Sequence, residues 1–160
     1  MDVVANGVSG RMADKLDLYH RQVLQPEGDP MAGNGFGIIG KLQQPVESMA
    51  FLQQVKEIFR CDRLRYTTPH TPSIQRVAVC GGAGASFFKQ ALAGQADIYI
   101  SGDFKYHDFF LTENRIMIAD IGHYESEQFT KEIFYEILTK KISKFAVQFS
   151  EINTNPIKYL

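Results

Sequence analysis

In the second half of the chain, short apolar runs alternate with stretches of helical periodicity. The runs have the length and composition of buried strands, and they lie at residues 76–80, 97–101 and 115–121. Apolar residues at helical spacing follow each run, in segments that begin near Ser86, Tyr106 and Gln128. Strands that alternate with helices join through right-handed crossovers. The pattern therefore predicts an α/β fold, with a mostly parallel sheet covered by helices on both faces.

The first half of the chain is less regular. Residues 8–18 and 46–60 carry apolar side chains at helical spacing, and each segment is expected to form a helix. Residues 25–45 are rich in glycine and proline, which interrupt helices, so a connecting loop is expected there. Residues 145–149 alternate as a last strand. With 160 residues and no internal repeat, the chain is expected to be one domain, residues 1–160.

Composition and charge narrow the class of protein. Hydrophobic residues make up 44% and charged residues 22%, which is typical of a globular protein with one sizeable core. The net charge of −1 and the lack of a basic cluster predict no nucleic-acid partner. No apolar run approaches the ~20 residues of a membrane span, and the N-terminus does not resemble a signal peptide. Cys61 and Cys80 form no CxxC motif, which favours reduced thiols and a cytoplasmic location.

The most informative short motif follows the apolar run 115–121. His123 and Glu127 stand four residues apart where a helix should begin. Because about 3.6 residues make one helical turn, the two side chains should project from one face. An imidazole nitrogen and a carboxylate oxygen are a common ligand pair for zinc, manganese or iron. The alternative is that Glu125 and Glu127 only favour the helix dipole, with His123 as an ordinary loop histidine.

Two further segments should lie at the same edge, because ligands of open α/β sheets bind beyond the carboxyl ends of the strands. The glycine loop at residues 81–86 could either cradle an anion or merely permit a tight turn. Asp103, His107 and Asp108 could act as acid–base groups or ligands. Alternatively, Asp103 caps the following helix and His107 makes only local hydrogen bonds.

Three motifs together resemble the Nif-three-like family. They are VAVCGGAG at residues 77–84, ADIYISGD at residues 96–103 leading to Tyr106 and His107, and GHYESE at residues 122–127. Members of that family are described as dinuclear-metal-centre hexameric proteins and as homologues of GTP cyclohydrolase I type 2. The resemblance extends from residue 2 to about residue 158.

The resemblance implies a set of metal ligands. Family members hold two divalent ions with an adjacent histidine pair, an aspartate, and a histidine and glutamate four residues apart. His123 and Glu127 match the last two ligands, and Asp2 matches the aspartate. The adjacent histidine pair is absent from this chain. The chain thus resembles only the C-terminal portion of the family domain and is incomplete relative to it. It is expected to bind one ion weakly or none.

The resemblance also implies a function. The complete family domain is expected to be a metal-dependent hydrolase that opens a purine nucleotide ring, as a homohexamer with a nucleotide substrate. His107 is a candidate catalytic residue by its position alone. The alternatives are a non-enzymatic metal-binding or protein-interaction module and an inactive, truncated family member. Both alternatives gain support from the missing histidines.

Overall fold

Three parallel strands form the part of the sheet on which the site is built. In the computed structural model, which describes residues 7–29, 33–142 and 144–160, β4 (Ser73–Ala83) pairs in parallel with β5 (Ile98–Gly102). β5 in turn pairs in parallel with β6 (Met117–Asp120). These strands confirm the three runs expected from the sequence. β5 and β6 are buried throughout, and β4 is buried continuously from Val77 to Cys80, as is usual for parallel strands covered on both faces.

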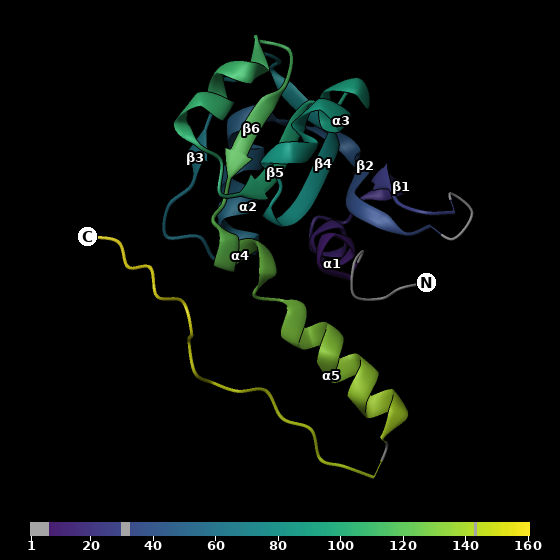
Figure 1. Ribbon diagram of the computed structural model, residues 1–160. Helices are drawn as coiled ribbons and strands as arrows, with labels where there is room; N and C mark the ends of the chain where they lie inside the picture. The colour runs from purple at the N-terminus through teal and green to yellow at the C-terminus, as the bar shows by residue number, and fades with distance from the viewer. Residues whose placement is uncertain (1–6, 30–32, 143) are drawn as a thin grey trace.

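The rest of the sheet is antiparallel. β1 (Tyr19–Pro26) pairs with β2 (Gly35–Glu47), β2 pairs with β4, and β3 (Arg65–Tyr66) pairs with β6, each in antiparallel orientation. The strand order is β1-β2-β4-β5-β6-β3 (Figure 1). The α/β class is therefore confirmed, whereas the expectation of a mostly parallel sheet is only partly correct. The connections from β4 to β5 and from β5 to β6 contain helical segments, as parallel pairing requires.

The expectation of a connecting loop over residues 25–45 is wrong for most of that segment. β1 reaches Pro26, and β2 occupies Gly35–Glu47, so most of this segment is strand. Glycine and proline are poor strand formers, which concealed the strand from the sequence pattern. β2 is held extended because it has a hydrogen-bonded neighbour on each side, β1 and β4. Pro45 falls between Lys41 and Val46, where the register with β4 shifts, so that it breaks no regular ladder.

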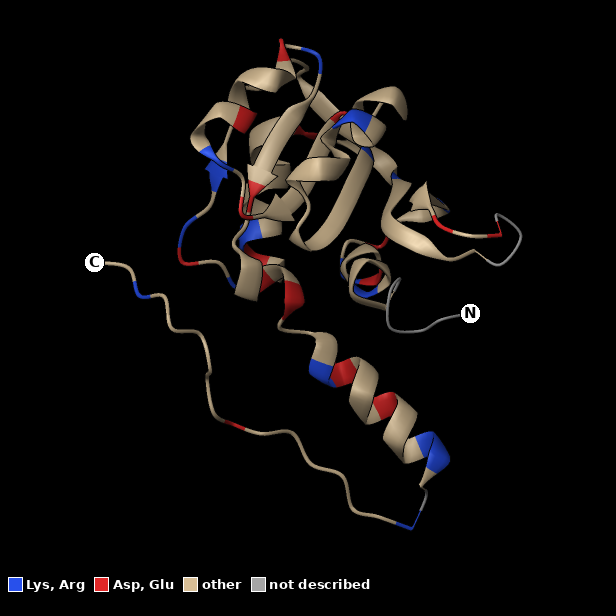
Figure 2. Ribbon diagram, in the orientation of Figure 1, with Lys and Arg blue, Asp and Glu red and all other residues tan. Residues whose placement is uncertain are grey.

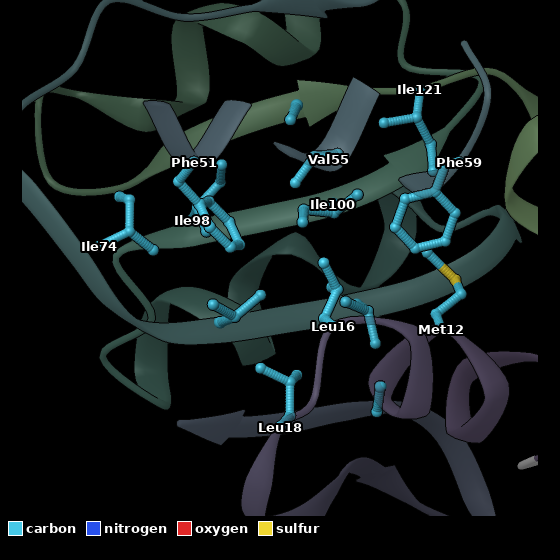
Figure 3. Packing of buried hydrophobic residues seen from close by; sticks show 14 of the residues in the cluster. Met12, Leu16, Leu18, Phe51, Val55, Phe59, Ile74, Ile98, Ile100 and Ile121 are labelled. Carbon is cyan, nitrogen blue, oxygen red and sulfur yellow. The ribbon is translucent and has the colours of Figure 1, made fainter. Parts of the chain in front are cut away.

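Helices cover both faces of the sheet, as expected. On one face, α1 (Gly7–Lys15) and α2 (Ser48–Ile58) confirm the two helices expected in the first half of the chain. They bury side chains against alternate strand residues (Figure 3), among them Met12, Leu16, Phe51, Val55, Phe59, Ile98 and Ile100. The opposite face is covered by η2 (Ala85–Phe87), α3 (Phe88–Ala93) and η3 (Tyr106–Thr112). Its core includes Ala78, Cys80, Phe88, Tyr99 and Ile118.

The chain ends in two helices and a long extended segment. α4 (His123–Glu127) follows β6, and α5 (Thr130–Lys141) continues away from the sheet (Figure 1). The strand expected at residues 145–149 is wrong: this stretch has no regular secondary structure and no strand partner within the described residues. Phe149 instead stacks on Tyr135 of α5, with ring centroids 4.7 Å apart. Among the described helices, none is long and apolar enough to cross a membrane.

Candidate functional site

The candidate site lies where β4, β5 and β6 end. β6 ends at Asp120, and Gly122 with φ 92° turns the chain directly into α4. That turn places the first residue of α4, His123, beside the residues that follow β5. Figure 2 shows acidic residues gathered at the end of β6 and along α4. The site therefore forms at the sheet edge at which ligands of α/β proteins bind.

His123 and Glu127 converge as their spacing predicts. The His123 Nε2 atom lies 3.4 Å from Glu127 Oε2, and the two side chains are 47% and 43% exposed. Both residues line a cavity of about 620 Å³. The C-terminal segment supplies the opposite wall of this cavity through Ile152, Thr154 and Asn155. A nitrogen and an oxygen donor thus face one hollow from a single helical turn, and their role as metal ligands stays a prediction.

Asp103 lies beside His123, a contact that the sequence pattern did not predict. Its Oδ2 atom lies 2.6 Å from His123 Nδ1, on the ring edge opposite Glu127. The sequence suggested a helix cap, but Asp108 fills that role by accepting a hydrogen bond from the Lys105 amide at 2.7 Å. The parallel register could have revealed the contact, because Ser101 of β5 pairs with Asp120 of β6. Residues that follow these two positions must therefore lie near one another.

The glycine loop packs beside Glu127, and two of its amides already have hydrogen-bond partners. The Gly82 amide donates to Ser126 Oγ at 2.8 Å, and the Gly84 amide donates to Ser101 Oγ at 3.0 Å. These N–H groups are therefore already satisfied by hydroxyl groups. Gly82 has φ +67°, and a Cβ atom there would lie 2.5 Å from Glu127 Oε1. Glycine at this position leaves room for the Glu127 carboxylate.

The remaining predicted site residues are His107 and Asp2. His107 is exposed on η3, where its ring contacts Tyr106 with centroids 5.4 Å apart, and it does not line the cavity beside His123. Asp2 lies outside the described residues. Within the described ranges, no group of three or more His, Cys, Asp or Glu side chains forms a metal cluster. The structure thus brings together two of the predicted ligands.

The buried carboxylate of this helix has a different role. Glu125 is only 8% exposed, and its Oε1 atom accepts a hydrogen bond from Asn155 Nδ2 at 3.1 Å. This contact fastens the C-terminal segment beside α4. The expectation that Glu125 only favours the helix dipole is therefore too narrow, because the side chain also holds the cavity wall in place.

In the metal-free protein, His123 should titrate above its ordinary pKa of 6.5. The hydrogen bond with Asp103 is the largest cause of the raised pKa of His123, with Glu127 adding to it and burial opposing it. Because the folded-state pKa exceeds the unfolded one, the pairing stabilises the fold below about pH 6.5. That contribution disappears as the pH rises through the folded-state pKa. An NMR titration checks this: Asp103→Asn should lower the pKa of His123, and an unchanged pKa would contradict the assignment.

The sequence matches one known protein family and several curated proteins. A family model described as Duf34/NIF3 (NGG1p interacting factor 3) matches residues 1–156. A Staphylococcus epidermidis protein named GTP cyclohydrolase 1 type 2 homolog is 38% identical over 130 residues, which cover 78% of this chain and 35% of that protein. A Streptococcus pneumoniae protein of the same name is 33% identical over 168 residues, covering 100% of this chain and 62% of that protein. The chain therefore spans only part of the length of these relatives.

Solved structures show the same fold. A Staphylococcus aureus hypothetical protein superimposes with a TM-score of 0.83 at 22% identity, covering 98% of this chain and 65% of that chain. A Bacillus cereus protein related to NIF3 gives a TM-score of 0.67 at 27% identity, covering 79% of this chain and 36% of that chain. The arrangement of helices and strands is thus shared with longer proteins.

Proposed function

This chain belongs to the Duf34/NIF3 family, and from that membership and the geometry of the site we propose that it binds a divalent metal through His123 and Glu127. The observation that supports the proposal most directly is the 3.4 Å approach of His123 Nε2 to Glu127 Oε2 on the wall of a cavity. Side chains that meet in this way across one helical turn can share a single ion.

The residues present fit a transition metal. The pair offers one imidazole nitrogen and one carboxylate oxygen, a donor set that suits zinc, manganese or iron. Gly82 keeps the space beside the Glu127 carboxylate free of a side chain. Catalytic zinc sites generally use three protein ligands, so a third is needed. Asp2 remains the proposed third ligand, by resemblance to the family pattern.

For the complete family domain we propose hydrolysis of a purine nucleotide ring, since the curated relatives are named GTP cyclohydrolase 1 type 2 homologs. A bound divalent metal would lower the pKa of its water and so supply a nucleophile near neutral pH. The cavity of about 620 Å³ falls in the range of small-molecule sites. His107 remains a proposed proton-transfer residue, supported only by its place after β5 at the same edge of the sheet.

A second candidate function is a non-enzymatic metal-binding or interaction module. It is favoured by the geometry, because within the described ranges no group of three or more His, Cys, Asp or Glu side chains is placed to hold a metal ion. Self-association into a homo-oligomer belongs to either proposal. It is supported by large apolar side chains left exposed on α5 and the C-terminal segment, including Phe134, Phe145 and Ile152. The two buried, unpaired cysteines are consistent with a cytoplasmic location as part of the proposal.

A turnover assay separates the two functions. GTP would be incubated with the chain and added manganese or zinc, and ring opening followed by the change in ultraviolet absorbance. The hydrolase proposal expects metal-dependent turnover that disappears in Glu127→Ala. Metal binding without turnover would favour the non-enzymatic module instead. Turnover that persists in Glu127→Ala would contradict the proposed site, and light scattering during size-exclusion chromatography would measure self-association on the same samples.

A further inference from the structure

The two nitrogens of the His123 ring face two different carboxylates. Nδ1 lies 2.6 Å from Asp103 Oδ2, and Nε2 lies 3.4 Å from Glu127 Oε2. The first distance is that of a strong hydrogen bond, whereas the second is longer than a well-formed one. A neutral imidazole carries one proton, so one nitrogen donates and the other presents a lone pair. The shorter contact therefore indicates which nitrogen is the donor.

The backbone brings Asp103 to the ring through a close approach of two chain segments. A Cβ atom at Gly102 would lie 2.8 Å from the His123 amide nitrogen and 2.9 Å from the Gly122 carbonyl group. Only glycine permits the end of β5 to approach the start of α4 so closely. Asp103 itself adopts φ 58°, in the left-handed region that few residues other than glycine and the Asn/Asp type tolerate. The carboxylate thus follows directly on the point where the end of β5 packs against the start of α4.

We propose that Asp103 is a positioning residue, which accepts the Nδ1 proton of His123 and so holds the Nε2 lone pair toward Glu127 and the cavity. The inference deepens the proposed function and rests on it, since a lone pair held in this direction is what a metal ligand requires. A carboxylate that accepts from the second nitrogen of a metal-binding histidine fixes the tautomer and the ring orientation.

An ordinary surface ion pair is the simplest competing explanation. Both side chains are about half exposed, at 47% and 51%, and exposed pairs contribute little to stability. Such a pair would favour the same Nδ1 proton, because a carboxylate can only accept a hydrogen bond. It would not change zinc affinity when Asp103 is replaced, whereas loss of a positioning residue would weaken zinc binding. Tautomer and zinc affinity together therefore distinguish a positioning role from a merely structural one.

The variant Asp103→Asn provides the test. Asparagine has nearly the same size and also tolerates the left-handed conformation, so the fold should be retained. Its amide group can donate to Nδ1, which would favour the tautomer with the proton on Nε2. Asp14→Asn is the matched control. Asp14 lies on α1 and is a 52% exposed carboxylate, and it pairs with Arg21 of β1 and not with His123.

Two measurements are made on each protein. In the first, long-range proton–nitrogen NMR spectra of chelator-treated protein, above the pKa of His123, report the ring tautomer. The wild type and Asp14→Asn should show His123 with the proton on Nδ1, and Asp103→Asn should lose this preference. In the second, zinc titration calorimetry should give 10- to 100-fold weaker binding for Asp103→Asn only, the range typical of residues that orient a ligand.

The outcomes separate this inference from the proposed function. A wild-type His123 that carries its proton on Nε2 would overturn the inference, as would an Asp103→Asn protein with unchanged tautomer or unchanged zinc affinity. A wild type that binds no zinc would instead contradict the proposed function. In that case the tautomer spectra, which need no metal, still decide whether Asp103 orients the ring.

Discussion

Replacing Glu127 by glutamine should weaken zinc binding to the chain by at least about 100-fold, because it turns the charged donor of the pair that faces the cavity into a neutral amide. Glutamine keeps the size of the side chain but lacks the negative charge that a divalent ion attracts. The loss should exceed the 10- to 100-fold effect typical of residues that only orient a ligand. Isothermal titration calorimetry on chelator-treated protein measures the dissociation constant directly.

The control for this variant is Glu136→Gln. Glu136 is a 49% exposed carboxylate on α5 that pairs with Arg11 at 2.7 Å, so it matches Glu127 in chemistry and exposure. Its replacement should leave zinc affinity unchanged within about twofold, since charges that do not touch the ion act only through screened, long-range interactions. Equal loss in both variants would show that zinc responds to overall charge and not to the His123 and Glu127 pair.

Phe59→Ala should lower the free energy of unfolding by about 3–5 kcal/mol, the typical cost of removing a fully buried phenylalanine ring. Phe59 is 0% exposed, directly follows α2, and packs beside Met12 of α1 (Figure 3). Its ring also contacts Phe129 edge-on, with centroids 6.0 Å apart. Without it, a cavity opens where α1, α2 and the junction of α4 with α5 meet. Urea denaturation followed by circular dichroism measures the loss.

Phe145→Ala is the matched control for the core variant. The Phe145 ring is 75% exposed on the C-terminal segment, so its removal opens no cavity. The expected change in the free energy of unfolding stays within about 0.5 kcal/mol, as for most surface substitutions. Similar destabilisation by the two variants would indicate that the exposed segment packs elsewhere, for example on a second copy of the chain.

The α/β class was predictable because the elements of the second half are locally consistent. The runs at 76–80, 97–101 and 115–121 are apolar on both faces, which only strands buried between two helical layers require. The antiparallel half was not predictable in the same way. β2 contains glycines and Pro45, and it is a strand because β1 and β4 pair with it on both sides. The converse error occurred at residues 145–149, whose alternation predicts a strand, although this stretch pairs with no strand in the part of the chain that the structure describes.

The proposed ligand pair shows the same division. The sequence by itself determined that His123 and Glu127 would face one side, because four residues span about one helical turn and need no other part of the chain. Only the tertiary structure decided that Asp103 meets the second ring nitrogen, that Gly82 leaves space beside the carboxylate, and that the C-terminal segment closes the cavity. These contacts join residues that are distant along the chain. Strand register and close backbone packing bring those residues together, and no local sequence pattern encodes either of them.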